Sequence, residues 1–543
     1  MSASPELDKY KQRLTSESST RKRDYLFAPG TPAEPGVRPI VSYDETRPDK
    51  AVREAADILV RAGRPIYLRR SSLTWLRDVP AKDFAEQPIM VKRFTDEGMR
   101  ENLRDELSES TNWRRKRSDA NIAVPPLVCT MLVDLAWKLG VVPEVEGLFL
   151  ASTLRPDGSL LSAEGYDPTT HFLLVDLPSM PPIAVEPSRT DAENALALLN
   201  GLLAEVMFVT RADRSVALSL ILSAVVRGAL AHIPLHIIKA PTIGSGKSFL
   251  VDVANVIATG QRCAAVAARS ETEKWERQIA MALHGGDPIV SLDNFNGELR
   301  SDLLAQAITQ SVVKALLPYG REMVEIECRS VLTANGNNIS IADDLGRRVV
   351  LCQIDAKSEK PWERRYASNP LEAIGMDRGR YVAAVLVLVR AYLAAGEPVG
   401  GRLPPLNGFA DYTRFVREPL VWLGEVDPVQ TQDTARSDDS NLQKKIAVFS
   451  AMAECFGVGE ASARTIIEML SEPSEDALLP KWRALQDALA GAVAPKPLNA
   501  ASLGYYLRAA SGNVITGLRL DNRNNRLGTK AWWMEAPGGG YGS

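Results

Sequence analysis

The stretch Ala240–Ser248, APTIGSGKS, follows the apolar run His232–Lys239 (HIPLHIIK) and precedes the helical pattern Phe249–Gly260 (FLVDVANVIATG). A strand, a glycine-rich turn and a helix that opens on Gly-Lys-Ser together form a cradle for the phosphates of a nucleotide. Backbone N–H groups at a helix N-terminus face such an anion, and the helix dipole favours its charge. We therefore predict an α/β fold organised around a phosphate-binding loop.

Each residue type in the loop has an expected task. Lys247 is expected to reach the β- and γ-phosphates of ATP and Ser248 to bind Mg²⁺, while the glycines let the backbone approach. The pattern GxxxxGK[ST] departs at Pro241, where its first glycine is expected, and a turn that binds no ligand is the alternative. The residues predicted to contact the nucleotide are Gly244, Ser245, Gly246, Lys247, Ser248 and Phe249.

Composition places few limits on function. Apolar residues make up 45% and charged residues 24% of 543 positions, as in an ordinary soluble protein of several domains. The net charge of −3 gives no general basic field, so any contact with nucleic acid must come from local patches. The five cysteines form no CxxC pair, which disfavours structural zinc or disulfides and fits a reducing cytoplasm. No apolar stretch reaches the ~20 residues of a membrane span and no signal-peptide core is seen, so we expect a cytoplasmic protein without membrane contact.

The region before the loop divides into a tail and a domain. Residues 1–40 are polar and rich in Pro and Gly, which predicts a disordered tail. Residues 41–187 mix helical patterns with short strand-like pieces and predict an N-terminal α+β domain. Arg69, Arg70 and the basic run Arg114–Arg117 could contact nucleic acid or could lie in solvated loops. No Asp-x-Asp pair occurs, which disfavours nucleotidyl transfer of the usual primase type.

An acidic residue ends the apolar segment PIVSLDN (Pro288–Asn294). This segment predicts a buried strand that carries Asp293 to the edge of the sheet, where a carboxylate can hold Mg²⁺ opposite Ser248. A surface aspartate at the end of a strand is the alternative. Asp293 and Ser248 are therefore our predicted metal ligands.

Two further segments carry polar residues at the ends of predicted strands. ECRSVLTANGNN (Glu327–Asn338) predicts a third strand that ends in amides, where Asn335, Asn337 and Asn338 could orient the attacking water or sense the γ-phosphate. A simple Asn-Gly turn is the alternative. Arg347 and Arg348 precede a fourth strand, where an arginine could act on the ATP of a neighbouring subunit or could pair with an aspartate of its own chain.

The remaining patterns complete the predicted domains. Residues 188–400 predict an ATPase core with lid helices at 370–400, and residues 401–441 predict a linker. Residues 442–536 predict a winged helix, because a helical pattern at Ala500–Ser511 precedes two strands. Residues 537–543 predict a flexible tail. The predicted DNA contacts of the helix and wing, for which protein docking is the alternative role, are Arg508, Arg519, Arg523, Arg526 and Lys530.

The ordered series GSGKS, LDN, TANGNN and DLGRR resembles the AAA+ class of P-loop ATPases, with its Walker A, Walker B, sensor 1 and arginine finger. More closely, the chain resembles the primase–helicase-like ATPases of phages, plasmids and genomic islands, which are related to superfamily 3 and MCM-type helicases. PDGSLLSAEGYD (156–167) and SLGYYLRAASGNVITGLRL (502–520) extend the resemblance. It implies an ATP- and Mg²⁺-dependent homo-oligomeric ring, a hexamer, acting on single-stranded or forked DNA, with primase or other replication proteins as further partners. The catalytic residues it implies are Lys247, Asp293, Asn337, and Arg347 or Arg348.

One departure from the family pattern bears on hydrolysis. Asn294 stands where typical AAA+ proteins carry the glutamate that polarises water, and Glu271, Glu273 or Glu298 could substitute for it. The expected function is an ATP-dependent DNA helicase or translocase in the replication of a mobile element. The alternative is a DNA-bound ATPase switch that recruits a partner, such as a replication loader or a phage-defence component, without unwinding.

Overall fold

The structure, a computed structural model, has a mixed α/β fold. It describes residues 38–70, 72–95, 98–267, 271–317, 323–342, 345–364, 369–437, 440–457, 459–471, 480–524 and 530–535. The predicted tails, except residues 38–40, therefore lie outside the described residues. The chain forms two compact units, each described by itself below. The first contains Met1–Asn296, Ser301–Ile339 and Arg348–Thr431, and the second contains Gly297–Arg300, Ser340–Arg347 and Gln432–Ser543.

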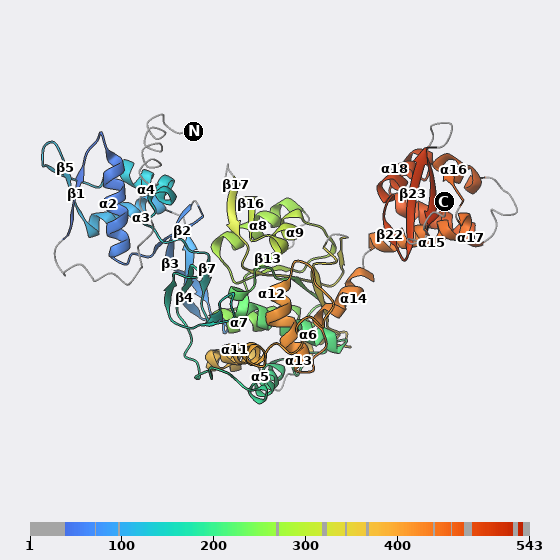
Figure 1. Cartoon of the computed structure of the whole chain (residues 1–543), viewed down its shortest axis with the longest axis horizontal. Helices are drawn as coiled ribbons and strands as arrows, with labels where there is room; N and C mark the ends of the chain where they lie inside the picture. The colour runs from blue at the N-terminus through green and yellow to red at the C-terminus, as the bar shows by residue number, and fades with distance from the viewer. Residues whose placement is uncertain are drawn as a thin grey trace. The chain divides into compact units, whose positions relative to one another are not determined.

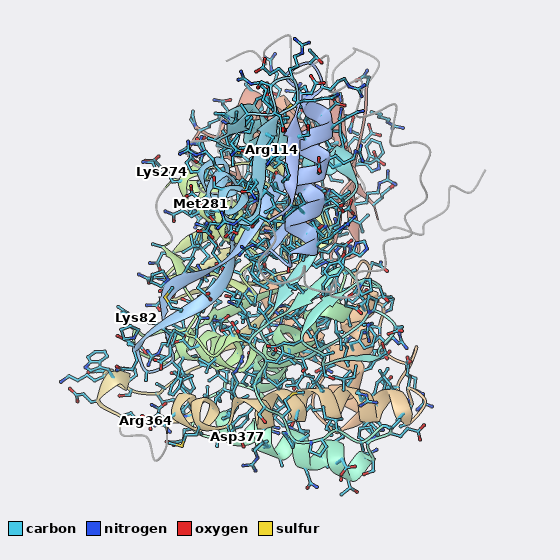
Figure 2. All side chains as sticks on the ribbon, turned by 90° about the vertical axis from the view of Figure 1, so that its left-hand side faces the viewer. Lys82, Arg114, Lys274, Met281, Arg364 and Asp377 are labelled. Carbon is cyan, nitrogen blue, oxygen red and sulfur yellow. The ribbon has the colours of Figure 1, made fainter. Side chains whose placement is uncertain are left out.

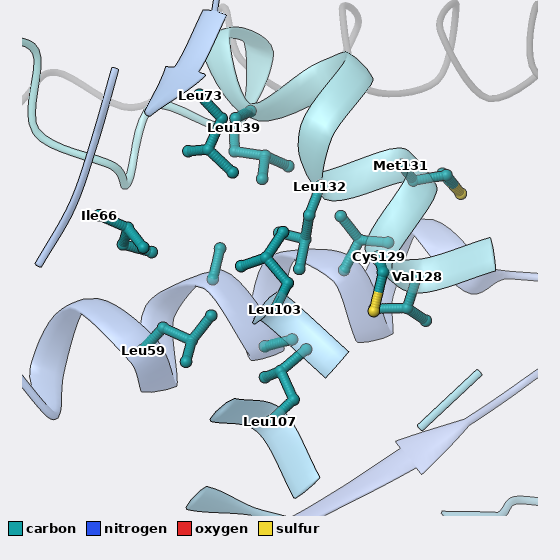
Figure 3. Packing of buried hydrophobic residues seen from close by; sticks show 14 of the residues in the cluster. Leu59, Ile66, Leu73, Leu103, Leu107, Val128, Cys129, Met131, Leu132 and Leu139 are labelled. Carbon is teal, nitrogen blue, oxygen red and sulfur yellow. The ribbon is translucent and has the colours of Figure 1, made fainter. Parts of the chain in front are cut away.

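The amino-terminal part of the first unit packs helices against a three-stranded sheet in the order β1-β5-β6 (Figure 1). Leu59, Leu103, Leu107 and Leu132 from the three helices meet in one buried core (Figure 3). Apolar residues recur on one face of each helix, and burying that face supplies most of the stability of such a layer. Its elements are β1 (Ile40–Tyr43), α2 (Pro48–Arg61), α3 (Met99–Ser110), β5 (Asn112–Arg115), β6 (Asn121–Ile122) and α4 (Pro126–Leu139).

Three further small sheets belong to this part of the unit, and all but one of their described strand pairs are antiparallel. The short strand-like pieces expected after Pro65 form a three-stranded sheet whose second strand is eleven residues long. Figure 2 shows this hairpin reaching to Lys82. The turns at residues 156–158 and 168–170 separate short strands. These elements are β2 (Ile66–Arg69), β3 (Ser72–Lys82), β4 (Pro88–Thr95), β7 (Gly147–Phe149), β8 (Thr153–Leu154), β9 (Leu160–Leu161), β10 (Gly165–Asp167) and β11 (Phe172–Leu174).

A five-stranded parallel sheet forms the centre of the first unit, in the order β13-β14-β18-β12-β20. Four of its strands are apolar runs that are largely buried, as parallel strands covered by helices require, whereas Ala265 and Ala267 of the edge strand β13 are exposed. The helix α6 (Arg211–Val226) is buried on nearly all sides, and it contacts α7 and β20. The sheet and its other helices are α5 (Arg189–Leu202), β12 (Leu235–Lys239), α7 (Lys247–Thr259), β13 (Ala265–Ala267), α8 (Thr272–Gly285), β14 (Ile289–Asp293), β18 (Val331–Gly336) and β20 (Val349–Gln353).

Shorter elements complete this unit around the sheet. They include a two-stranded antiparallel sheet of β16 and β17. The single-turn helix η3 follows β20. Their bounds are η2 (Arg227–Ala229), α9 (Asp302–Thr309), β16 (Val312–Leu316), β17 (Met323–Glu327) and η3 (Pro361–Glu363).

Two carboxy-terminal segments of this unit differ from expectation. The predicted lid helix α11 (Arg378–Ala394) is largely buried and contacts α5, α6 and α7, so it packs as a core helix. Residues 401–431, expected as most of the linker, are packed too, because Tyr412, Phe415 and Leu420 are fully buried there. The elements are α10 (Pro370–Met376), α12 (Ala410–Tyr412), a π-helical turn (Thr413–Arg417), α13 (Glu418–Trp422) and η5 (Pro428–Gln430).

The second unit consists mainly of helices beside a four-stranded sheet in the order β21-β24-β23-β22. Asn499 caps α18 by accepting from two backbone N–H groups of its first turn, which fixes where this helix begins. Leu503 and Leu507 of α18 lie in the same buried core as Leu485 and Trp532. Its elements are β15 (Gly297–Leu299), the end of β19 (Ile339–Ile341), α14 (Thr431–Ser437), α15 (Ser440–Phe456), β21 (Ala461–Ser462), α16 (Ala463–Ser471), α17 (Pro480–Val493), α18 (Ala500–Ala510), β22 (Val514–Ile515), β23 (Leu518–Asn524) and β24 (Lys530–Glu535). In the described part of the chain, no helix combines the length and apolarity needed to span a membrane.

Candidate functional site

The glycine-rich loop joins the carboxyl end of β12 to the start of α7, as the sequence predicts. Gly244 and Gly246 both adopt positive φ, +76° and +96°, a region that residues with a Cβ rarely enter. The Ser245 hydroxyl donates to the Thr242 carbonyl at 2.8 Å and lies 2.8 Å from the Thr242 hydroxyl, which closes the loop on itself. Pro241 is exposed and precedes these contacts, so its replacement of the first glycine leaves the loop geometry intact.

Lys247, the first residue of α7, turns back across the loop. Its ammonium donates to the side-chain Oδ1 of Asn337 at 2.7 Å and to the Thr242 carbonyl at 3.3 Å. Burial lowers the pKa of Lys247 below its ordinary value, and the nearby Asp293 carboxylate acts in the opposite direction. The lysine and the predicted sensor asparagine, 90 residues apart in sequence, are thus direct neighbours.

The two predicted metal ligands also meet. The Ser248 hydroxyl donates to Asp293 Oδ1 at 3.1 Å. Hydroxyl and carboxylate oxygens are the ligands that Mg²⁺ prefers, and it commonly takes only one or two carboxylates together with waters and substrate phosphates. Ser248 is exposed and Asp293 half-buried, so both oxygens lie where a hydrated ion can reach them. This pair fits a Mg²⁺ bound between protein and phosphate.

The order of the strands explains why these four side chains converge. All five strands are parallel, so their carboxyl ends lie on one edge of the sheet. β18 pairs with β12 on one side and with β14 on the other. Asn337 therefore lies between the loop that follows β12 and Asp293 at the end of β14.

Asn335, on the same strand end, has a different role from Asn337. It is buried, and its side-chain Oδ1 accepts from the Asn294 N–H at 3.1 Å. Its backbone carbonyl accepts from the Phe295 N–H at 2.8 Å. Asn294 has a φ of +55°, a conformation that asparagine tolerates better than most residues. Asn335 thus fixes the turn after Asp293, a supporting role that the sequence pattern alone did not indicate.

The proposed substitutes for a catalytic glutamate are engaged elsewhere. Glu271 accepts from Lys274 at 2.9 Å, Glu273 pairs with Arg277 at 2.5 Å, and Glu298 pairs with Arg300 at 3.4 Å. Each is paired within its own helix turn or strand. Among the contacts described for Lys247, Ser248 and Asp293 none is to these glutamates, so the general base stays unassigned.

The two candidate finger arginines lie in different places. Arg348 stands at the start of β20, where its carbonyl accepts from the Leu235 N–H at 3.0 Å. Lys247 lies beyond the carboxyl end of β12, at the opposite edge of the sheet from Arg348. A strand of five residues spans about 16 Å between these two edges. Arg348 therefore cannot contact a nucleotide held by the loop of its own chain. Arg347 belongs to the second unit, where its carbonyl accepts from the Gln432 side chain at 3.1 Å.

The basic residues near the amino terminus make structural contacts. Arg69 is buried on β2 and donates to the His284 carbonyl, so a role in binding nucleic acid is wrong for this residue. Arg70 pairs with Glu327 at 3.0 Å. In the basic run, Arg114 (Figure 2) pairs with Asp119 at 3.5 Å, and its neighbours Arg115 and Lys116 pair with Glu45 and Asp44. Neighbouring carboxylates thus offset much of the charge of this run.

The predicted DNA contacts lie on α18 and the two long strands of the second unit. Arg508 is exposed, and its Nε donates to the Gly504 carbonyl at 2.9 Å, which leaves the outer guanidinium nitrogens toward solvent. Arg519 pairs with Asp521 at 3.3 Å, and Arg523 pairs with Glu460. Lys530 is exposed at the start of β24, whereas Arg526 lies outside the described residues. DNA binding by these residues stays a prediction.

Comparison with known proteins gives only distant likenesses. No protein-family model and no curated protein matches the chain. The apo A form of the NrS-1 C-terminal region is similar with a TM-score of 0.37 and 10% identity, covering 88% of this chain and 98% of that one. A second structure of that region has a TM-score of 0.35 and 13% identity, covering 81% and 86%. SCCmec type IV Cch, described as an active helicase, has a TM-score of 0.31 and 11% identity, covering 78% and 93%. At such scores the likeness assigns neither fold nor function to this chain.

Proposed function

We propose that the chain is an ATP hydrolase of the AAA+ P-loop class that moves or unwinds DNA for a mobile genetic element. One observation carries the hydrolase part: Lys247 contacts Asn337, and Ser248 contacts Asp293, at the carboxyl edge of a parallel sheet. This edge is where ligands bind in open α/β sheets. A turn with no ligand would not need a lysine, a hydroxyl, a carboxylate and an amide from three strand ends.

The residues have distinct proposed tasks. The N–H groups of Gly244 to Lys247 and the Lys247 ammonium would bind the phosphates, and Ser248 and Asp293 would hold Mg²⁺. The ion, when bound, offsets the charge that develops on the phosphates during hydrolysis. Asn337 orients the lysine by accepting from its ammonium at 2.7 Å. The main chain around Asn294 is held by Asn335, which keeps the Asp293 carboxylate in place.

The ring and the DNA contacts rest on resemblance together with geometry. Arg348 lies at the edge of the sheet opposite the glycine-rich loop of the same chain. If this arginine takes part in catalysis, it must therefore contact the nucleotide of a neighbouring subunit. We propose a homo-hexamer for this reason and because of the resemblance to ring helicases. In the second unit, α18 and the strands β23 and β24 form the proposed winged helix that binds single-stranded or forked DNA.

The test is the rate of ATP turnover by the full chain, with and without single-stranded DNA. We expect a magnesium-dependent rate that DNA raises, and we expect Lys247→Ala to abolish it. Lys274→Ala is the matched control, because Lys274 is an exposed lysine on α8 that pairs only with Glu271 in the described contacts. Displacement of a strand from a forked duplex by the active protein then tests the helicase part.

Two results would contradict this proposal, one its hydrolase part and the other its helicase part. Turnover by the unmodified chain that equals that of Lys247→Ala, with and without DNA, would refute the hydrolase. Turnover that DNA stimulates but that displaces no strand would refute unwinding and leave a DNA-bound ATPase switch.

A further inference from the structure

A large aromatic side chain lies against the glycine-rich loop. Trp362, on the single-turn helix η3, is 61% exposed although tryptophan is usually highly buried. A Cβ placed on Gly244 would lie 3.3 Å from Trp362 Cε3 and 3.5 Å from Trp362 Cβ. The indole therefore borders the loop at one of the two glycines with positive φ.

The segment that carries this tryptophan leaves β20 close to the start of the loop. The Ile354 N–H donates to the carbonyl of Lys239, the last residue of β12, at 2.9 Å. This bond ties the segment that follows β20 to the residue just before the loop. Pro361 is buried and opens the helical turn, where its fixed φ suits the first position. Figure 2 shows Arg364, two residues after Trp362, at the outer edge of the ribbon.

Fold stability does not account for the position of Trp362. A mostly exposed indole contributes little burial, whereas the adjacent Pro361 is the buried residue of this turn. A cavity of about 450 Å³ lies along the same segment and is lined by Ala356, Ser358, Lys360, Pro361 and Arg364, among others. Neither Trp362 nor a residue of the glycine-rich loop lines this cavity, so the position of the indole rests on its contact with Gly244 alone. An open aromatic face and a phosphate-binding loop thus lie together.

We propose that Trp362 is the platform on which the base of the bound nucleotide stacks. This inference rests on the proposed function, because it assumes that the loop binds the phosphates of a nucleotide. Every nucleobase has a flat π-face, and its stacking on an aromatic side chain is strong but tolerant of base identity. Trp362 thus makes the site select nucleotides over bare polyphosphates without selecting adenine over guanine. The site's preference between ATP and GTP has to come from other residues.

The test compares ligands with and without a base on the full chain. Binding of the magnesium complexes of AMP-PNP, GMP-PNP and inorganic tripolyphosphate is measured by titration calorimetry. We expect Trp362→Ala to weaken both nucleotides about tenfold, a loss within the range of base–aromatic stacking, and to leave tripolyphosphate unchanged. Trp362→Phe retains a ring and should recover most of the affinity.

Two controls separate this inference from the proposed function. Trp137→Ala removes another exposed tryptophan, on α4, and should bind all three ligands like the unmodified chain. Lys247→Ala should weaken all three ligands alike, because it removes a phosphate contact. If the unmodified chain binds none of them, the proposed function fails and the inference fails with it.

Three outcomes would overturn the inference alone. Nucleotide affinity that is unchanged in Trp362→Ala would show that the base lies elsewhere. An equal loss for nucleotides and tripolyphosphate would show that Trp362 only supports the loop. A gain of affinity in Trp362→Ala would show that the indole covers the loop rather than receiving the base.

Discussion

The ammonium of Lys247 and the side-chain oxygen of Asn337 lie 2.7 Å apart, although 90 residues separate them in sequence. The contact exists because β18 is inserted between β12 and β14, so its end faces the loop directly. A lysine that is held in this way is already oriented toward the phosphate position. Pre-orientation of a charged group is a large part of how such sites stabilise a transition state.

Replacement of Asn337 tests this orientation. We expect Asn337→Ala to lower kcat for ATP hydrolysis about a hundredfold, the order seen when one positioned polar group is removed from a catalytic site. The change in KM should be smaller, because the loop N–H groups still bind the phosphates. Asn338→Ala is the matched control, since Asn338 is exposed and next in sequence. Equal rates for the two variants would contradict a catalytic role for Asn337.

The buried pair of Arg417 and Asp427 should dominate the stability of the segment after α11. Arg417 is 1% exposed and bonds both carboxylate oxygens of Asp427, at 2.7 and 2.5 Å. Asp427→Ala leaves a buried guanidinium with only the Pro404 carbonyl, at 2.7 Å, among its described partners. We expect the free energy of unfolding to fall by about 3–5 kcal/mol, measured by urea denaturation.

The control for this prediction is an exposed ion pair. Glu273→Ala removes the partner of Arg277 on the surface of α8 and should cost less than about 1 kcal/mol. If both variants lose equally little stability, the Arg417–Asp427 pair contributes no more than an exposed ion pair, and the prediction is wrong.

A pH-dependent stability should arise from Glu327. Burial raises the pKa of this carboxyl to about 7, from an ordinary value of 4.5, and Arg69 and Arg70 offset the burial only in part. Between these values the folded chain holds a proton that the unfolded chain has released. The free energy of unfolding should therefore decrease as the pH rises from 4.5 to 7.

Glu327→Gln removes this titration, so its urea midpoint should change less between pH 4.5 and pH 7 than that of the unmodified chain. Glu325→Gln, on the same strand but exposed and paired with Lys314, should keep the original dependence. A Glu327→Gln profile that parallels the unmodified one would refute the shifted pKa.

Contacts of the second unit with DNA should appear in the salt dependence of binding. Arg508→Ala and Lys530→Ala each remove one exposed cation and should each reduce the slope of log K against log salt by about one. Arg523→Ala should have a smaller effect, because that guanidinium already pairs with Glu460. Fluorescence anisotropy with labelled single-stranded DNA at several salt concentrations gives the slopes.

Arg464→Ala is the control for the DNA experiment, since Arg464 is an exposed arginine on α16 paired with Glu468. Slopes that are the same for Arg464→Ala and Arg508→Ala would mean that α18 has no special part in binding. That result would favour a winged helix that docks on protein, the alternative considered from the sequence.

Much of the fold follows from local sequence. Ser188 with Asp191 caps the start of α5, and the largely apolar run from Val216 to Val226 forms the buried helix α6. The sequence also predicted the strand that ends at Asp293 and the glycine-rich turn before α7. These signals are local, because capping, periodicity and glycine conformations depend on neighbouring residues alone.

What the sequence could not supply is which strands are neighbours. Nothing in the spacing of Lys247, Asp293 and Asn337 says that β18 lies between β12 and β14, and this order decides the contacts at the site. The role of Asn335 in holding the turn after Asp293 could not be predicted for the same reason, since its hydrogen-bond partners follow the adjacent strand. The segment 401–431 was misread because its polar and Pro-containing composition masks a few deeply buried aromatics, such as Phe415.

The end of β18 holds two asparagines with different neighbours, and this couples both halves of the proposed site. Asn337 contacts Lys247, while Asn335 holds the main chain that follows Asp293. A displacement of this one strand end would therefore act on the lysine and on the turn after Asp293 together. A substitution at either asparagine should accordingly affect both the proposed phosphate contact and the proposed metal ligand.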